Sequence, residues 1–275
     1  MTLFDQTQTE PVALTALEFD VLWQHLGLGT PPLVIKVPSP GRTHTERAAL
    51  EREAWDTLGA KGLGRPVSVD ERLVAMLRLL ATPTREVDAR LWLGRSVRVL
   101  AAAREDADEG VLAVLDAGTL TLKTISALSL AREAVNLLHP HPAGPGRSVT
   151  LPSKHLDEAA HASQGDPARL AEALVSRDIR PDDAHVIKEM IKDASHQGQF
   201  GAATRDPAWS RRRRADRVIG FFDTPTGRYL QTRRDTEAGE AWSTVAPVDN
   251  RRLTQHVETL LAELLEPAEP PSRGR

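Results

Sequence analysis

The sequence predicts an α+β fold in which helices flank a central antiparallel β-sheet. In some segments apolar residues recur at helical spacing behind capping signals, and in others they alternate with polar residues. The turns between successive strands are too short for the crossovers that parallel pairs need. The order strand, helices, strand meander and helix occurs twice along the 275 residues, and neither meander can cover both of its faces alone. We therefore predict a quasi-two-fold internal repeat whose halves share one sheet.

Capping signals place the helices of the first half, residues 14–138. In Thr15-Ala-Leu-Glu18 and Thr43-His-Thr-Glu46, the Thr hydroxyl can accept an amide hydrogen bond while the Glu reaches back to the cap. Each of these capping boxes predicts a helix start, and Ser68-Val-Asp-Glu71 is interpreted as a third. Between the first two helices, the β-forming residues at 33–37 predict a short strand.

The hydrophobic period changes from helical to alternating at Arg85. From there to Leu93, Val87, Ala89 and Leu91 share one face of a strand, and the residues between them belong to the other face. Short polar or glycine turns then separate three further strands, and a helix closes the half. We predict these strands at 96–102, 110–115 and 119–125, and the helix at 126–138.

Residues 139–146, His-Pro-His-Pro-Ala-Gly-Pro-Gly, predict a linker because they are the stretch richest in proline and glycine. The same order of elements returns in the second half, 147–265. We therefore predict a single domain over 14–265, with flexible tails at 1–13 and 266–275. The expected strands are 147–151, 197–204, 217–223, 228–233 and 241–246, and the expected helices are 153–162, 182–194, 250–264 and one that starts at Asp166-Pro167.

Composition excludes several functional classes. The chain contains no cysteine, which removes disulfides, thiolate nucleophiles and Cys-ligated zinc. Its net charge of −3 argues against general nucleic-acid binding. Residues 1–12 lack Lys, Arg and an apolar run, so they do not resemble a secretory signal peptide. No stretch approaches the roughly 18 apolar residues of a membrane span. We therefore expect a cytoplasmic protein without membrane insertion.

The fingerprints of nucleotide binding, of α/β-hydrolases and of HExxH zinc enzymes are missing from the sequence. His139 and His141 could bind a metal as a pair, but a proline-rich linker usually exposes histidines without further ligands. Asp106 begins a stretch that is similar to a calcium loop. Val111 and Ala117 stand where that loop needs Gly and Glu, which favours a hairpin turn. We predict no metal, cofactor or catalytic residue.

Three charged groups stay open between a structural and a functional role. Asp182, Asp183 and His185 could act in acid–base catalysis, but acidic residues at a helix start complement the helix dipole. The stretch Asp223-Thr-Pro-Thr-Gly-Arg228 could form a site, although its Pro and Gly fit a turn between two strands better. The run Arg211–Arg214 could grip phosphate or an acidic partner, although such runs are more often solvated. We favour the structural role for all three groups.

Six short blocks stand out in the sequence, EFDVLW (18–23), GRTHTER (41–47), SVTLP (148–152), GQFGA (198–202), DTPTGRYL (223–230) and TVAPVD (244–249). Together they resemble the EspG family of type VII secretion proteins. Each block alone is weak, but all six occur in the family's order and span nearly the whole chain. The resemblance implies an α+β fold with a quasi-two-fold repeat, a central antiparallel sheet and two helical bundles.

The resemblance also implies a function. EspG proteins are cytosolic, non-enzymatic chaperones of actinobacterial type VII secretion that need no cofactor. They bind the helical tip of the PPE subunit in PE–PPE heterodimers, keep it soluble and direct it to the secretion machinery. We therefore expect a PE–PPE-like helical substrate as the partner and no nucleic acid, while a weak homodimer stays open.

Family members contact their client through a sheet hairpin and the C-terminal helical bundle. The matching regions here are the turn at 93–96 and the helices within 153–194, both of which lie outside the six blocks. These helices are rich in alanine and present shallow surfaces with a polar rim. The expected partner-binding residues are Gly94, Arg95 and Ser96 in the turn and His155, Glu158, Lys188 and Lys192 in the helices.

Two other functions stay open as alternatives. A hydrolase-like enzyme of unknown substrate could use Asp223, Arg228 and the arginines from Arg211, and a cleft with converging ionisable groups is its signature. A nucleic-acid-binding regulator could use the stretch 205–235, where nine Arg against four Asp give a local charge of +5. For that function, DNA affinity must fall steeply with added salt.

Overall fold

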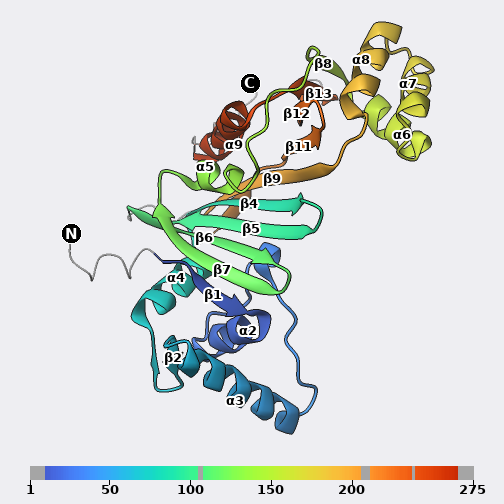
Figure 1. Cartoon of the computed structure of the whole chain (residues 1–275). Coiled ribbons are helices and arrows are strands. Elements are labelled where there is room, and N and C mark those ends of the chain that lie inside the picture. The colour runs from blue at the N-terminus through green and yellow to red at the C-terminus, as the bar shows by residue number, and fades with distance from the viewer. Residues whose placement is uncertain (1–9, 105–107, 206–210, 237–238, 266–275) are drawn as a thin grey trace, which may run out of the picture. The chain divides into compact units, whose positions relative to one another are not determined.

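The computed structural model describes residues 10–104, 108–205, 211–236 and 239–265. These residues fall into two units, which we call the N-terminal and C-terminal units. The N-terminal unit takes its residues from 1–90, 95–134 and 204–213, and the C-terminal unit takes them from 91–94, 135–203 and 214–275. Antiparallel strands and helices occur in both units (Figure 1). The α+β class and the antiparallel sheet are therefore confirmed, whereas the equivalence of the halves 14–138 and 147–265 stays a prediction.

The sheet of the N-terminal unit is the predicted meander with one further strand at its edge. Ala117 and Gly118 join the third and fourth strands of the meander in a two-residue turn, and both have positive φ, as a tight hairpin requires. The added strand pairs with the fourth and includes Val12 and Ala13, which were expected in a tail. In spatial order the strands are β1 (Val12–Thr15), β7 (Thr119–Ser126), β6 (Glu109–Asp116), β5 (Ser96–Ala103) and β4 (Arg85–Trp92).

Two of the three predicted capping boxes are confirmed. Thr15 and Thr43 each accept the backbone N–H of the Glu three residues later, at 3.1 Å, and each Glu accepts the N–H of its cap. The third box is wrong, because Asp70 is the cap of that helix and Ser68 belongs to a small hairpin instead. The elements are α2 (Ala16–His25), α3 (His44–Ala60), α4 (Glu71–Ala81), and the hairpin strands β2 (Gly64–Arg65) and β3 (Ser68–Val69).

The strand predicted at 33–37 is also wrong, since η1 (Leu33–Ile35) is a single 3-10 turn. Pro31 and Pro32 remove two ladder donors before it, and Val34 and Ile35 are buried in the core instead of being paired. The helix expected at 126–138 is limited to α5 (Leu130–Val135). It is shorter because Ser126 is still part of β7, and because Ser129 donates its hydroxyl to the Ser126 carbonyl and so turns the chain before the helix.

One apolar core lies between the sheet and the helices of the N-terminal unit. Figure 1 shows α2, α3 and α4 gathered against one face of this sheet. Alternate residues of β5, β6 and β7 point into that core, as the period of a strand requires. Their main contacts from the helices are Phe19, Leu22, Trp23, Leu58, Leu73, Met76, Leu77 and Leu80, all at most 3% exposed.

In the C-terminal unit all five predicted strands are present and form one antiparallel array. Their bounds differ from the predicted ones by at most two residues at each end. The spatial order is β9 (His196–Arg205), β11 (Ile219–Thr224), β12 (Gly227–Asp235), β13 (Ala241–Pro247) and β8 (Val149–Pro152). The helices are α6 (Ser153–Ser163), α7 (Pro167–Val175), α8 (Pro181–Ile191) and α9 (Asn250–Leu265).

The segment 139–146, which was predicted to be a linker, is fixed to the β11–β12 hairpin of the same unit. The Arg228 N–H donates to the Pro142 carbonyl at 2.8 Å, and the Gly144 N–H donates to the Arg228 carbonyl at 3.1 Å. Glycine is needed at the crossing, since a Cβ on Gly144 would lie 2.1 Å from a Tyr229 ring carbon. Proline and glycine therefore serve close packing in this segment.

Candidate functional site

The helices α6, α7 and α8 follow one another in the C-terminal unit and pack as a bundle (Figure 1). Asp166 caps α7 as predicted, since its carboxylate accepts the N–H groups of Ala168 and Arg169. Proline occupies the first turn of both α7 and α8. Each helix buries one apolar stripe in the bundle, formed by Leu156, Ala159, Leu170, Leu174, Ala184, Ile187 and Met190. The opposite surfaces of these helices stay open.

A shallow groove of about 510 Å³ runs between α7 and α8, and we call it the α7–α8 groove. Small side chains form its floor, which allows another backbone to approach closely. Val175 is the largest apolar residue there and is 42% exposed. The rest of the lining is Ala168, Ala171, Pro181 and Ala184, with Glu172, Ser176, His185 and Lys188 as the polar residues.

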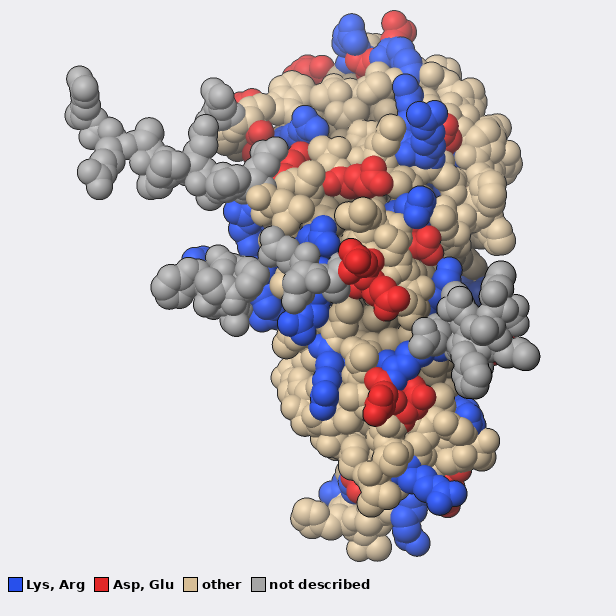
Figure 2. All heavy atoms as spheres, turned by 90° about the vertical axis from the view of Figure 1, so that its left-hand side faces the viewer, with Lys and Arg blue, Asp and Glu red and all other residues tan. Residues whose placement is uncertain are grey.

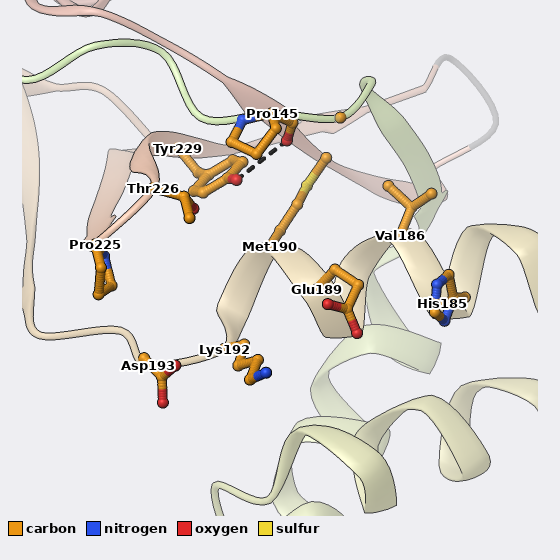
Figure 3. A pocket seen from close by; sticks show the side chains of 11 residues that line it. Pro145, His185, Val186, Glu189, Met190, Lys192, Asp193, Pro225, Thr226 and Tyr229 are labelled. Atoms are coloured by element: carbon orange, nitrogen blue, oxygen red, sulfur yellow. Dashed lines mark hydrogen bonds between the residues drawn. The ribbon is translucent and has the colours of Figure 1, made fainter.

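A second hollow, of about 440 Å³, lies on the other side of α8, and we call it the Tyr229 hollow. Figure 3 shows the Met190 side chain reaching from α8 toward Pro145, where the Tyr229 hydroxyl donates to the Pro145 carbonyl at 3.1 Å. Pro225 and Thr226, from the β11–β12 turn, form another wall. His185, Glu189, Lys192 and Asp193 are the charged or titratable groups that line it. His185 lines both hollows, so α8 is a ridge between them.

A buried ion pair fixes the wall that β11 and β12 provide. Arg228 is fully buried and binds the Asp223 carboxylate through two N–H groups, at 2.6 and 2.8 Å. It also donates to the Asn250 side chain and, at 3.2 Å, to the His139 carbonyl. We call Arg228, Asp223, Asn250 and the His139 carbonyl the Arg228 cluster. Its hydrogen bonds hold four segments of the unit together, so the structural interpretation of Asp223 and Arg228 fits this geometry.

The structure separates the four predicted helix residues. Lys188 lines the α7–α8 groove and Lys192 lines the Tyr229 hollow. Glu158 and His155 line neither of them. Glu158 accepts a hydrogen bond from Arg177 at 3.1 Å, and the Nδ1 atom of His155 is enclosed without a hydrogen-bond partner. Only the two lysines are thus placed to meet a ligand in these hollows.

The predicted turn residues Gly94, Arg95 and Ser96 are all exposed. Gly94 has a φ of 74°, which glycine adopts without strain. Arg95 donates to both carboxylate oxygens of Asp116 at 2.8 Å, across the neighbouring hairpin. Trp92, two residues before the glycine, is 51% exposed. This turn therefore exposes the charged side chain of Arg95, which is already paired with Asp116, and the large aromatic side chain of Trp92.

Sequence reasoning named none of Val175, Met190, Tyr229 or Trp92 as a site residue. A helical wheel could have found Val175, because it lies about 100° from the stripe that Leu170 and Leu174 define. The alternating pattern of β4 already placed Trp92 on the polar face of its strand. No local pattern indicates Met190 or Tyr229, because their hollow arises from segments that are far apart in the chain.

The weaker candidates also find structural partners. Asp183 binds Arg147 and Arg180, and the hydrogen bond from Arg147 together with that from Arg180 lowers the pKa of its carboxyl. His141 shares a 2.8 Å hydrogen bond with the Thr224 carbonyl. Within the described ranges, no group of three or more His, Cys, Asp or Glu residues could hold a metal ion. Asp106, the start of the calcium-like stretch, lies outside the described residues.

Arg211–Arg214 are exposed, in keeping with a solvated run, and Arg212–Arg214 form a short strand, β10, that pairs with β9. Arg212 binds the buried Glu86 of the same unit. On the face shown in Figure 2, Lys and Arg side chains are interspersed with Asp and Glu. In the part of the chain that the structure describes, no helix is long and apolar enough to cross a membrane.

Comparison with known families decides the classification. The EspG family model matches residues 15–259, which is most of the chain. The protein belongs to the EspG family. A search of curated proteins finds no significant match. Among solved structures, this EspG-family chain is similar to a chain in the structure of the Mycobacterium tuberculosis type VII secretion system chaperone EspG5 in complex with the PE25–PPE41 dimer.

That similarity has a TM-score of 0.72 and covers 95% of this chain and 99% of the other. At 17% sequence identity, it shows a shared fold. The α+β architecture of this EspG-family protein is therefore confirmed by an independent structure. The family resemblance that the six sequence blocks indicated is confirmed as well.

Proposed function

We propose that this protein is a cytosolic type VII secretion chaperone that binds the helical tip of a PE–PPE-like substrate, keeps it soluble and targets it for export. Membership of the EspG family over residues 15–259 is the observation that carries the proposal. The shared fold with a chain from the EspG5 complex with the PE25–PPE41 dimer supports it.

The two hollows beside α8 suit such a client. Exposed apolar surface on a substrate aggregates unless a partner covers it. The small residues of the α7–α8 groove let a helical tip approach closely, and the 42% exposed Val175 offers an apolar contact there. A few buried anchors supply most of the binding energy at such interfaces. We therefore assign the apolar anchors of the client to these hollows.

Polar contacts at the rims of the hollows would fix the orientation of the client. Lys188 and Lys192 stand at the rims of the groove and of the hollow, respectively. Gly94, Arg95 and Ser96 form an exposed turn that we propose as a second contact region, with Trp92 beside it. His155 and Glu158 belong to the same bundle, but we give them no direct contact because they line neither hollow.

We also propose that the protein acts by binding and not by catalysis. Asp223 and Arg228, the strongest candidates for chemistry, are 6% and 0% exposed and bind each other. A catalytic carboxylate must reach its substrate. Binding of this kind requires no cofactor and places the protein in the same compartment as the unexported client.

Co-expression tests the proposal. The protein should form a soluble complex with a PE–PPE heterodimer from the same genome, and the heterodimer expressed alone should be less soluble. Reversal of both rim charges, with Lys188→Glu and Lys192→Glu, should weaken the complex about ten-fold, because both of the proposed polar contacts at the rims then carry the opposite charge. Lys36→Glu with Arg42→Glu is the matched control, since it makes the same charge change at exposed positions of the N-terminal unit.

The possible outcomes distinguish a wrong function from a wrong binding site. If no PE–PPE heterodimer is captured under any condition, the chaperone proposal is wrong. If the heterodimer is captured but the lysine double variant binds as tightly as the control, the client docks elsewhere. Calorimetry on the purified complex gives the two dissociation constants, and circular dichroism shows that both variants are folded.

A further inference from the structure

We propose that a cluster of arginines on α9 and the neighbouring strands binds a short acidic segment of a second protein. The cluster consists of Arg217, Arg234 and Arg252 around His256, and we call it the α9 arginine face. It uses none of the residues that line the α7–α8 groove or the Tyr229 hollow. The inference is independent of the proposed function.

The charges that act on His256 show which residues lie together. Arg217, in the bend just before β11, Arg234 on β12 and Arg252 on α9 all lie close enough to His256 for their charges to lower the pKa of its imidazole. The Arg217 guanidinium donates to both carboxylate oxygens of Glu263 on α9, at 2.6 Å. On α9, His256 follows Arg252 by four residues and Glu263 follows His256 by seven. This spacing places all three on one side of the helix. Arg217 and Arg234 therefore share one surface with these three helix residues.

Positive charge on this face is only partly balanced. Glu263 neutralises Arg217, whereas Arg234 and Arg252 have no acidic side chain within 4.0 Å among the residues that the structure describes. Both of these side chains belong to exposed residues. Burial lowers the pKa of His256, and the charges of Arg234, Arg217 and Arg252 lower it further. At neutral pH an uncharged imidazole thus lies among three guanidinium groups.

Asp249 caps the N-terminus of α9 by accepting the Arg252 N–H at 2.8 Å, and two arginines follow this cap. Arg251 and Arg252 occupy the first turn of α9, which contains no acidic residue. Cations at a helix N-terminus oppose the helix dipole, which favours negative charge there. A bound anion would pair with the guanidinium groups of Arg234 and Arg252, which have no carboxylate partner among the described residues.

The surroundings favour a short acidic peptide over a nucleic acid. A nucleic acid needs a continuous positive track along its backbone. The chain carries a net charge of −3, and Glu263 lies directly beside Arg217 on this face. The exposed side chains of Arg234 and Arg252 suit one or two carboxylates, which guanidinium groups bind through paired hydrogen bonds.

A fluorescent hexaglutamate peptide is the probe for the test, measured by anisotropy with the full chain at low salt. We expect saturable binding that Arg234→Gln with Arg252→Gln weakens by about ten-fold or more, because two charge-assisted contacts are lost. Arg251→Gln is the matched control, since it removes a neighbouring charge about 100° away on the helix. We expect that control to bind within about two-fold of the wild type.

A second readout follows the imidazole. The His256 ring resonances in a proton NMR titration should give a higher pKa with the peptide bound, because a nearby anion favours the protonated ring. Three outcomes would overturn the proposal. They are equal loss of binding in the Arg251→Gln control, tighter binding of single-stranded DNA of equal charge than of the peptide, and no binding at low salt. Capture of the PE–PPE heterodimer should be unchanged in the Arg234 and Arg252 variant.

Discussion

The two units hold their sheets in different ways. In the N-terminal unit, a continuous apolar core joins the sheet to three helices, and its buried carboxylate Glu18 pairs with Lys61, a lysine whose side chain is still 39% exposed. In the C-terminal unit, Arg228 is fully enclosed and ties β11 and β12 to segments far away in the sequence. Apolar packing loses stability in proportion to the atoms removed. When one partner of a buried ion pair is removed, the other charge stays buried without compensation, and the protein loses much stability at once.

The largest expected effect comes from the Arg228 cluster. Arg228→Met should lower the free energy of unfolding by about 3–5 kcal/mol, because Asp223 is left buried without its cation. Adding Asp223→Asn should restore much of that loss, since the uncompensated charge is then gone. Urea unfolding followed by circular dichroism measures both variants. If the double variant is less stable than Arg228→Met, the uncompensated charge of Asp223 is not the cause of the lost stability.

A deletion in the apolar core should have a somewhat smaller effect. Leu77 is fully buried on α4 within the core of the N-terminal unit. Leu77→Ala should cost about 3 kcal/mol through lost burial and the cavity left behind. Amide hydrogen exchange should show the loss of protection mainly in the N-terminal unit, and Arg228→Met should show it mainly in the C-terminal unit. Equal loss in both units for either variant would mean that they unfold together.

The crossing of segment 139–146 over β12 is the next feature to test. Gly144→Ala should cost about 1–3 kcal/mol, because the new methyl group overlaps the Tyr229 ring. Gly118→Ala is a useful comparison, since no atom lies within 4 Å of its Cβ position and only its positive φ is unfavourable. If Gly144→Ala unfolds at the same urea concentration as the wild type, the segment is less tightly packed than the structure indicates.

The smallest expected effect depends on pH. Burial raises the pKa of Glu18, but hydrogen bonds from Lys61 and from the Thr15 amide outweigh it and hold the pKa below its usual value. A lowered pKa contributes stability above the unfolded-state pKa of about 4.3, and this stability is lost as the pH falls through the folded-state pKa. Glu18→Gln should be less stable than the wild type at neutral pH and should equal it in acid. Urea midpoints across the acid range measure this difference, and a constant gap would contradict the assignment.

Much of the fold follows from local patterns. The two Thr–Glu capping boxes, the Asp166-Pro167 start and the alternation of Val87, Ala89 and Leu91 act within one turn or one strand, so their signals are complete in the sequence. The strand at 33–37 was wrong because β-forming side chains do not supply a pairing partner. The strand Val12–Thr15 was missed because its four residues carry little strand signal of their own. They form a strand because the edge of β7 supplies their hydrogen-bond partners.

The candidate site was less predictable, for a related reason. All four helix residues were predicted as the polar rim of their helices. In the structure, Lys188 and Lys192 each line a hollow, but His155 and Glu158 line neither. A hollow depends on how helices and turns pack, which periodicity does not specify. Tyr229 reaches its hollow only because segment 139–146 crosses above it, and that crossing is a contact over more than 80 residues of chain.

The close approach of Gly227 to Gly144 also limits how the polypeptide can be re-engineered. A Cβ on Gly227 would lie 2.4 Å from the Gly144 Cα, so the backbones touch with no room for an inserted reporter or for new chain ends. The stretch that looks most like a hinge is therefore a poor place to open the chain for circular permutation. The tip between β2 and β3 is a better choice, because Val67 there is 94% exposed and exposed loop tips tolerate insertion.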